Sequence, residues 1–295
     1  MKQILETSGG ITLNIGELLT KAYDILKSSN IDTYILDAQL LLQKVLKKEK
    51  LFIILNRDFG VTKEEQEEFL KLISLRKDKM PVKYILRECE FMGLPFDIRE
   101  GVLIPRGDTE VLVENVIDEI KKNSYDKICD VCCGSGAIGL SIAKFVENIQ
   151  TYCYDISDIA YEVTKDNIEK FQIQARAQVF KSDLLSRAIN EGKVFDVVVS
   201  NPPYIKRDVI PTLMDDVKNY EPYIALCGGE DGLDFYRKIT EQSLQVLNKG
   251  GLLAFEIGHD QRVAVENILN ENQFRDIRSI KDLAGLDRVV LGYKC

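Results

Sequence analysis

The chain has 295 residues, enough for one large domain and one smaller domain, each with its own core. Its apolar fraction of 45% and charged fraction of 29% are those of a soluble protein, and no apolar run approaches the roughly 18 residues of a membrane span. The net charge is −8, with +1 over residues 1–95 and −9 over the rest, so the larger part lacks the basic excess of a protein that follows a phosphate backbone. We therefore expect neither a membrane nor a nucleic-acid partner.

The N-terminus has neither an apolar stretch nor a small-residue cleavage site, so it does not resemble a secretory signal and we expect a cytoplasmic protein. Seven cysteines, an odd number in a chain of this size, do not indicate a disulfide framework. Cys129 and Cys132 have CxxC spacing, but no second pair and no histidine lies nearby, so we expect no metal site. The single histidine, His259, excludes a Ser-His-Asp or Cys-His mechanism elsewhere in the chain.

Residues 15–77 carry apolar side chains at helical spacing. Two such stripes are Ile15, Leu18, Leu19, Ala22, Ile25 and Leu26, and Ala38, Leu41, Leu42, Val45 and Leu46. A further helix start is indicated by Thr62 and Glu65, which have the spacing of a capping box. We therefore predict a small all-α bundle over residues 1–88.

Residues 89–101 contain short extended pieces broken by glycine and proline, which predicts a linker or hairpin. Beyond it, in residues 102–295, strand-like apolar runs alternate with helical stretches at 127–131, 150–154, 178–180, 195–200 and 252–257. The alternation is typical of βαβ units and of a mostly parallel sheet with helices on both faces. Two last runs, with no helix between them, predict a terminal antiparallel pair at 274–280 and 288–293. The predicted fold class is α/β, with seven strands.

A glycine-rich turn follows the first of these strands. Gly134, Gly136 and Gly139 match the dinucleotide-binding GxGxxG pattern, and Asp155 lies at the distance of an acid that binds a ribose hydroxyl. The pattern is weak by itself, because a tight turn that packs a helix on a strand needs the same glycines. An NAD-dependent enzyme therefore stays open at this point.

Three acids favour a different cofactor, S-adenosylmethionine. Asp130, Asp155 and Asp183 end three successive strands, so they face one crevice of a parallel sheet. Asp130 would compensate the cationic end of the cofactor, and Asp155 would accept from both ribose hydroxyls. Asp183 would accept from the adenine amino group while Leu184 covers the ring. Any one of these acids alone would more often be a helix N-cap.

The fourth strand runs directly into Asn201, Pro202, Pro203 and Tyr204. Two successive prolines fix φ and remove two backbone donors, which gives a rigid turn whose carbonyls are free to accept. The Asn201 side-chain oxygen and the Pro202 carbonyl can hold the two hydrogens of an acceptor NH₂, and the Tyr204 ring can stack on a planar amide or base. An isolated tetrapeptide of this kind is more often a plain turn. Its position after the fourth strand predicts an N-methyltransferase that works by orientation, without a metal or a strong base.

Further segments match one pattern: Pro81 to Ile85, Leu103 to Arg106, Asp108 to Glu110, Glu221-Pro222, Ala225-Leu226, Gly228-Gly229, Asp231 to Leu233, Glu256 to Gly258 and Asp282 to Gly285. With these, the sequence resembles the HemK/PrmC family, the class I methyltransferases that modify the glutamine of the GGQ motif in peptide chain release factors. The resemblance implies a Rossmann-like methyltransferase domain over 102–295, a release factor as partner, and an N-terminal domain over 1–88 that helps to hold it. It also implies cofactor contacts from Cys132, Cys133, Gly134, Ser135, Gly136, Asp155, Leu184 and Asn201, with Asn201 to Tyr204 holding the glutamine.

Three positions depart from that pattern, because Cys132 and Arg87 replace glycines and Gly107 replaces a proline. Each lies in a loop or hinge, and none removes a proposed acceptor. Three alternatives also stay open. They are the same chemistry on a ribosomal protein, a DNA adenine-N6 methyltransferase, which shares Asn-Pro-Pro-Tyr, and a module that binds without turnover.

Overall fold

The structure is a computed structural model that describes residues 13–295. The chain divides into two compact units, with the boundary between Leu86 and Arg87. No helix in the described part of the chain is long and apolar enough to cross a membrane.

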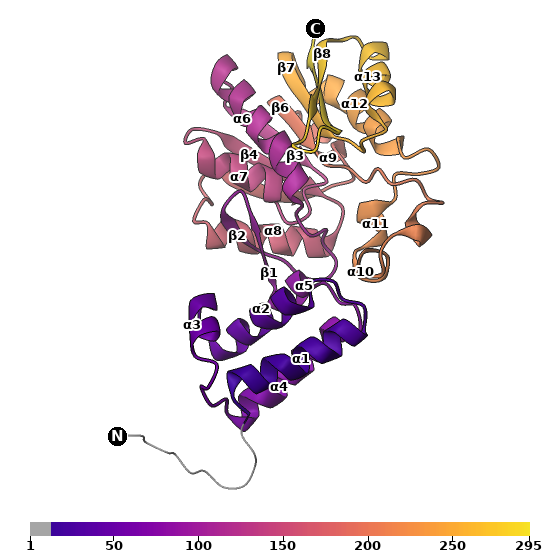
Figure 1. The fold of residues 1–295 in the computed structure, drawn as a ribbon. Coiled ribbons are helices and arrows are strands. Elements are labelled where there is room, and N and C mark those ends of the chain that lie inside the picture. The colour runs from indigo at the N-terminus through magenta and orange to yellow at the C-terminus, as the bar shows by residue number, and fades with distance from the viewer. Residues whose placement is uncertain (1–12) are drawn as a thin grey trace. The chain divides into compact units, whose positions relative to one another are not determined.

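The first unit is a bundle of helices, drawn in indigo and purple in Figure 1. Its helices are α1 (Ile15–Ser28), α2 (Tyr34–Leu46), α3 (Lys50–Leu55), α4 (Lys63–Lys77) and α5 (Val82–Leu86). The predicted apolar stripes form its core, in which Leu18 and Leu41 are fully buried. The predicted capping box is confirmed, since Thr62 and Glu65 satisfy each other's backbone N–H groups at the start of α4. The all-α prediction for this part of the chain is therefore confirmed.

The hairpin that opens the second unit consists of β1 (Glu88–Phe91) and β2 (Leu94–Asp97). Phe91 and Phe96 are buried in the core of the larger unit, so the hairpin belongs to that unit and is not a free linker. Asn167 fixes it further, because its side chain accepts from the Asp97 N–H at 2.8 Å and donates to the Asp97 carbonyl at 3.0 Å. Asn167 and Asp97 are 70 residues apart in the sequence, so local periodicity could not predict this contact.

The rest of the second unit is built on a seven-stranded sheet of order β5-β4-β3-β6-β7-β9-β8. Its strands are β3 (Lys127–Val131), β4 (Gln150–Asp155), β5 (Ala177–Lys181), β6 (Phe195–Ser200), β7 (Leu247–Glu256), β8 (Phe274–Lys281) and β9 (Asp287–Lys294). All neighbouring pairs are parallel except β7 with β9 and β8 with β9. The predicted α/β class, with its terminal antiparallel pair, is confirmed.

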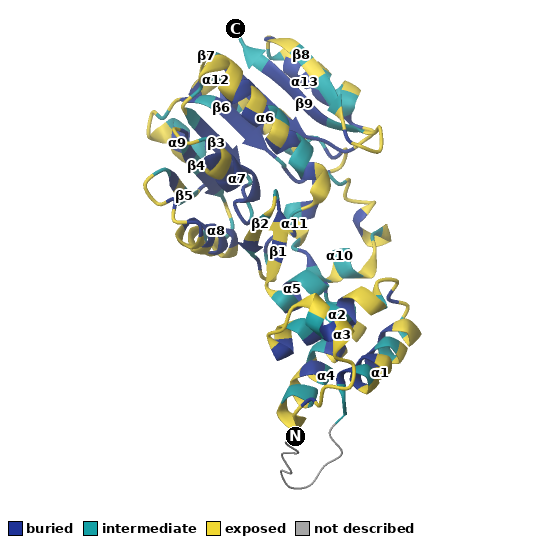
Figure 2. Ribbon diagram, turned by 60° about the vertical axis from the view of Figure 1, so that its left-hand side comes forward, coloured by how far each residue is buried: buried dark blue, intermediate teal, exposed yellow. Residues whose placement is uncertain are grey.

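Helices cover both faces of the sheet (Figure 1). One face packs against α6 (Glu110–Asn123), α7 (Ala137–Phe145) and α8 (Asp158–Lys170), and the other against α9 (Ser186–Asn190), α12 (Asp234–Val246) and α13 (Arg262–Glu271). Alternate residues of β6 supply the two cores, since Val197 and Val199 belong to one and Val198 to the other. The central strands are therefore mostly apolar and buried on both sides (Figure 2).

The strand order reverses between β3 and β6, because β4 and β5 lie on one side of β3 and β7 lies beyond β6. Ligands of open parallel sheets bind beside the carboxyl ends of the strands at such a point. The remaining short elements follow β6 or precede α6. They are η1 (Gly107–Thr109), η2 (Ile210–Thr212), α10 (Asp215–Tyr220) and α11 (Tyr223–Leu226).

Candidate active site

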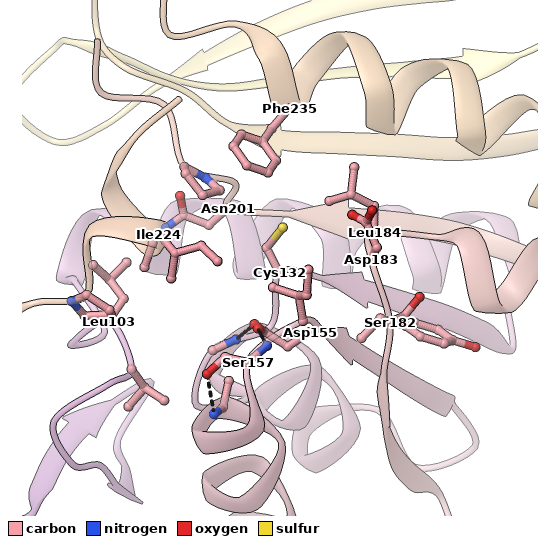
Figure 3. A pocket seen from close by; sticks show the side chains of 18 of the residues that line it. Leu103, Cys132, Asp155, Ser157, Ser182, Asp183, Leu184, Asn201, Ile224 and Phe235 are labelled. Atoms are coloured by element: carbon pink, nitrogen blue, oxygen red, sulfur yellow. Dashed lines mark hydrogen bonds between the residues drawn. The ribbon is translucent and has the colours of Figure 1, made fainter. Parts of the chain in front are cut away.

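A cavity of about 220 Å³ lies at the carboxyl ends of β3, β4, β5 and β6 (Figure 3). Its floor consists of residues that directly follow or end those strands: Cys132, Gly134, Tyr154, Asp155, Ile156, Ser157, Ser182, Asp183, Leu184, Asn201 and Pro203. Its outer wall comes from segments between the strands: Gly101, Val102, Leu103, Pro222, Ile224, Ala225, Phe235 and Lys238. The cavity therefore occupies the switch point that the sheet topology indicates.

The turn between β3 and α7 is shaped by two glycines in the left-handed region, Gly134 with φ +57° and Gly136 with φ +79°. A Cβ on Gly136 would meet Leu140 and Thr164 at about 3 Å, whereas a Cβ on Gly134 would meet nothing within 4 Å. Gly136 is therefore needed where the turn packs closely against α7 and α8. Gly134 instead leaves room beside the cavity that it lines.

Asp155 ties this turn to the end of β4. One carboxylate oxygen accepts from the Gly134 N–H and the other from the Ser157 N–H, both at 2.9 Å. Burial raises the pKa of Asp155, and these backbone hydrogen bonds partly offset the rise. Each oxygen keeps a further lone pair, so the carboxylate can still accept from hydroxyl groups in the cavity.

Cys132 and Leu184 are non-glycine residues in the left-handed region, with φ 59° and 49°, and both line the cavity. Such a conformation costs roughly 1–2 kcal/mol at a residue with a Cβ. Burial, followed by the charges of Asp155 and Asp130, raises the pKa of the Cys132 thiol well above its usual range. The thiol is therefore a neutral part of the wall. Figure 3 shows the Cys132 side chain among the other lining residues, with its sulfur directed away from Asp155 in this view.

Asp130 lies behind the wall of the cavity and not on it. It is fully buried, and its Oδ2 accepts from the Gly139 N–H at 2.8 Å while Oδ1 has no hydrogen-bond partner. Burial raises its pKa to about 7. Ser135 also lies behind the wall, where its carbonyl accepts from the Asn167 side chain. Cys133, beside Thr164, and Gly136 are likewise not lining residues.

The tetrapeptide after β6 contributes Asn201 and Pro203 to the cavity wall. The Asn201 side-chain Nδ2 donates to the Thr109 hydroxyl at 3.4 Å. Pro202 is buried and Tyr204 half-buried, and neither is a lining residue. The Tyr204 hydroxyl instead donates to Glu256 Oε1 at 3.3 Å. Direct stacking of Tyr204 on a planar acceptor therefore stays a prediction.

Several residues of the site were not singled out by their chemistry in the sequence. Ile224, Phe235 and Lys238 line the cavity, and Thr109 and Glu256 contact the side chains of the tetrapeptide. The segments matched by resemblance include Thr109 and Glu256 and adjoin Ile224, so they indicated these positions, whereas Phe235 and Lys238 lie beyond them. Among residues 13–295, no group of three or more His, Cys, Asp or Glu side chains is placed to hold a metal ion, and each cysteine is free.

The sheet, the glycine turn and the cavity are those of a methyltransferase, and a family model described as "Methyltransferase small domain" matches residues 107–215. A second model, "PrmC N-terminal domain", matches residues 17–86. The chain is 58% identical to a release factor glutamine methyltransferase of Clostridium botulinum, over 94% of this chain and 98% of the relative. It is 51% identical to the Clostridium acetobutylicum protein of that name, over 96% and 99%. The chain belongs to the release factor glutamine methyltransferase family.

One solved structure shows the same fold at low sequence identity. A 16S rRNA methyltransferase of T. thermophilus, in complex with AdoMet and guanosine, aligns with a TM-score of 0.50 at 16% identity, over 70% of this chain and 50% of that one. The family resemblance inferred from the motifs is confirmed by these comparisons. They support the methyltransferase hypothesis and not the NAD-dependent alternative.

Proposed function

We propose that the chain transfers a methyl group from S-adenosylmethionine to the side-chain amide nitrogen, N5, of the glutamine in the GGQ motif of peptide chain release factors. The observation that carries the proposal is that Asn201 and Pro203 share one cavity with Asp155 and Leu184, in a chain 58% identical to a protein named for this activity. The proposed cofactor and acceptor sites are therefore adjacent, as a direct transfer requires.

The lining residues fit S-adenosylmethionine. The Asp155 carboxylate would accept from the ribose hydroxyls with its remaining lone pairs, and Asp183 would accept from the adenine amino group. Leu184 and Ile156 offer apolar surface to the ring, and the open space beside Gly134 admits the cofactor close to the backbone. Bound there, the cofactor would supply a methyl group on a positively charged sulfur.

Asp130, Cys133, Ser135 and Gly136 would support this site from behind. The Asp130 carboxylate holds the first turn of α7 through the Gly139 N–H, and its charge would favour the cationic end of the cofactor. The remaining three would fix the shape of the turn. Cys132, which stands where the family pattern has a glycine, would contact the cofactor directly from the wall.

The acceptor amide would be held by Asn201 and Pro202. The Asn201 side-chain oxygen and the Pro202 carbonyl can accept the two N–H hydrogens of the glutamine, which turns the nitrogen toward the methyl group. Bound S-adenosylmethionine would supply the methyl group, its S–C bond breaking as the new N–C bond forms, and one amide proton would pass to solvent. Tyr204, the third member proposed for catalysis, is fixed by Glu256 and would support the acceptor. Orientation and charge complementarity account for the rate, without a metal or a strong base.

The first unit would supply part of the protein–protein contact. Residues 17–86 match the PrmC N-terminal domain, and the family relatives are named for an acceptor that is itself a protein. We assign release-factor binding to the first unit, which ends at Leu86, and methyl transfer to residues 102–295; the segment 89–101, predicted as a linker or hairpin, belongs to the larger unit. Because release factors act in translation, this proposal retains the cytoplasmic location expected from the sequence.

The experiment that tests this function offers the full chain three acceptors separately, with methyl-labelled S-adenosylmethionine. The acceptors are a release factor, ribosomal proteins and duplex DNA. We expect label in the release factor alone. Label in a ribosomal protein would move the activity to the nearest alternative, and label in DNA that weakens steeply with salt would identify a nucleic-acid enzyme. Calorimetry with S-adenosylhomocysteine and NADH provides the cofactor control, with heat expected from the first only.

A further inference from the structure

A chain of polar side chains connects Asn201 to a buried carboxylate. The Asn201 Nδ2 donates to the Thr109 hydroxyl, and Thr109 in turn lies against Glu256. Glu256, at the end of β7, is 2% exposed and accepts from the Tyr204 hydroxyl through Oε1. Its Oε2 makes no hydrogen bond of ordinary geometry. Thr109 comes from η1, Asn201 and Tyr204 follow β6, and Glu256 ends β7, so three separate segments meet here.

The direction of these hydrogen bonds decides which end of the Asn201 amide faces the acceptor. The Thr109 hydroxyl lies close enough to the Glu256 carboxylate to favour its ionised form. Because a carboxylate only accepts, that hydroxyl turns its hydrogen toward Glu256, and its lone pairs then accept from Asn201 Nδ2 at 3.4 Å. With its NH₂ group held by Thr109, Asn201 is left with its oxygen free to accept from another NH₂. The opposite orientation would place two NH₂ groups against each other.

We infer that Glu256 is a positioning residue that, through Thr109 and Tyr204, fixes Asn201 with its side-chain oxygen toward the acceptor amide. This inference rests on the proposed function, because it assigns a direction to the same acceptor site. Glu256 touches neither proposed substrate and acts through its two neighbours.

The surroundings of Glu256 keep the carboxylate close to its ionisation point. Burial raises its pKa to about 6, while the Thr109 hydroxyl, the Arg288 charge and the Tyr204 hydroxyl oppose the rise and Asp108 adds to it. Arg288, on β9, also pairs with Asp108 at 3.1 Å and Asp282 at 3.0 Å.

The Tyr236 hydroxyl, on α12, contacts the main-chain carbonyl of Glu256 at 3.0 Å and not its side chain. Because the pKa of Glu256 is about 6, its carboxylate is ionised above about pH 6 and protonated below it. When Glu256 is protonated, its O–H can donate to Thr109, and the direction of the whole chain of hydrogen bonds is lost.

The test measures methyl transfer to a release factor by Glu256→Gln, Thr109→Val and Thr109→Ser, with kcat and KM determined between pH 5 and pH 8. A glutamine has one oxygen for two donors, so we expect Glu256→Gln to lower kcat roughly 10²-fold with KM for S-adenosylmethionine unchanged. Thr109→Val should lose a similar factor, and Thr109→Ser, which keeps the hydroxyl, should restore most of it.

The pH profile separates positioning from simple structural support. In the natural chain kcat should fall about tenfold at one pH unit below the pKa of Glu256, because a tenth of the carboxylates remains ionised. In Glu256→Gln this decrease should be absent.

The matched control is Glu119→Gln. Glu119 is also a buried carboxylate, and it accepts from the Tyr293 hydroxyl and pairs with Arg278. This substitution should leave kcat and its pH profile unchanged. Two outcomes would overturn the inference while the natural chain still methylates the release factor. One is an unaltered kcat in Glu256→Gln, and the other is a kcat of Thr109→Ser that is as low as that of Thr109→Val. Either outcome would leave the proposed function standing. A natural chain that methylates no glutamine would instead remove the proposed function itself.

Discussion

Two groups of acids, one at each end of the central sheet, have pKa values that are shifted in opposite directions. At the carboxyl ends of the strands, the pKa values of Asp130, Asp155 and Glu256 are raised, because burial outweighs the donors around them. At the amino ends, the pKa values of Glu119 and Asp196 are lowered. Burial alone would raise these two as well, but it is outweighed by the donors that face them.

The donors explain the difference. Glu119, on α6, accepts from Tyr293 and Arg278, and Asp196 accepts from Asn248 and from the backbone N–H groups that open β3. At the other end, one oxygen of Asp130 and one of Glu256 lack a hydrogen bond of ordinary geometry. An acid whose oxygens are all hydrogen-bonded stabilises the fold, whereas a buried acid with an unpaired oxygen lowers its stability, a cost that is usual near functional sites. Substitutions at the two ends should therefore affect different measurements.

The largest effect is expected from Asn201→Ala. Removal of the side chain that orients the acceptor should lower kcat roughly 10²–10³-fold while the melting temperature stays near that of the natural chain. Asn123→Ala is the matched change at the amino end, where the side chain donates to Glu119, and should leave kcat unchanged. Steady-state kinetics with a release factor measure both. An Asn201→Ala variant with full activity would show that the orientation mechanism is wrong.

The second-largest effect is expected from Asp155→Asn, which should weaken cofactor binding. One amide NH₂ would face a backbone N–H of Gly134 or Ser157, and the charge-assisted acceptor for the ribose would be lost. We expect the affinity for S-adenosylhomocysteine to fall by about 2 kcal/mol, measured by calorimetry. Asp158→Asn, on an exposed side chain three residues along, is the control and should bind normally. Equal affinity of the two variants would contradict the assignment of Asp155 to the cofactor.

Glu119→Gln tests the amino end and should affect stability alone. Loss of the ionised acceptor for Tyr293 and Arg278 should lower the free energy of unfolding by about 2 kcal/mol at neutral pH. The pKa of Glu119 is lowered by folding from its ordinary value of 4.5, so its contribution is complete above that value and disappears as the pH falls below it. Denaturant titrations at several pH values should show the two proteins converge in acid. A constant difference would contradict the role given to the charge.

The smallest effects should come from a pair of glycines with similar conformations. Gly134 has φ +57° and Gly192, in the loop before β6, has φ +62°, and an added Cβ meets nothing within 4 Å at either. Alanine at each should therefore cost a similar amount of stability, about 1 kcal/mol. Only Gly134→Ala places its methyl group beside the cavity, so only that variant should also bind S-adenosylhomocysteine more weakly. Thermal unfolding and calorimetry give the two quantities.

The sequence predicted the parts of this structure that produce a periodic pattern of apolar residues or that lie on one short segment. Period and capping predicted the helices of the first unit, and the alternation of strands and helices predicted the sheet. The glycine turn and the Asn-Pro-Pro-Tyr segment pointed to the edge of the sheet where Gly134, Asp155 and Asn201 lie together.

The parts that sequence patterns missed depend on long-range contacts. Asp130 follows the same pattern as Asp155, yet one is closed behind the first turn of α7 and the other faces the cavity. Phe235 and Lys238 reach the outer wall only because α12 packs beside the sheet there, and Glu256 meets Thr109 across 147 positions of the chain. No local periodicity contains such pairs.

The central claim is that the carboxyl end of this sheet methylates a glutamine held by Asn201. The most direct test incubates the full chain with methyl-labelled S-adenosylmethionine and a release factor, then digests the product and locates the label by tandem mass spectrometry. We predict one methyl group on the side-chain nitrogen of the GGQ glutamine, and none when the enzyme carries Asn201→Ala. Label on any other residue, or the same label from the Asn201→Ala enzyme, would contradict the account.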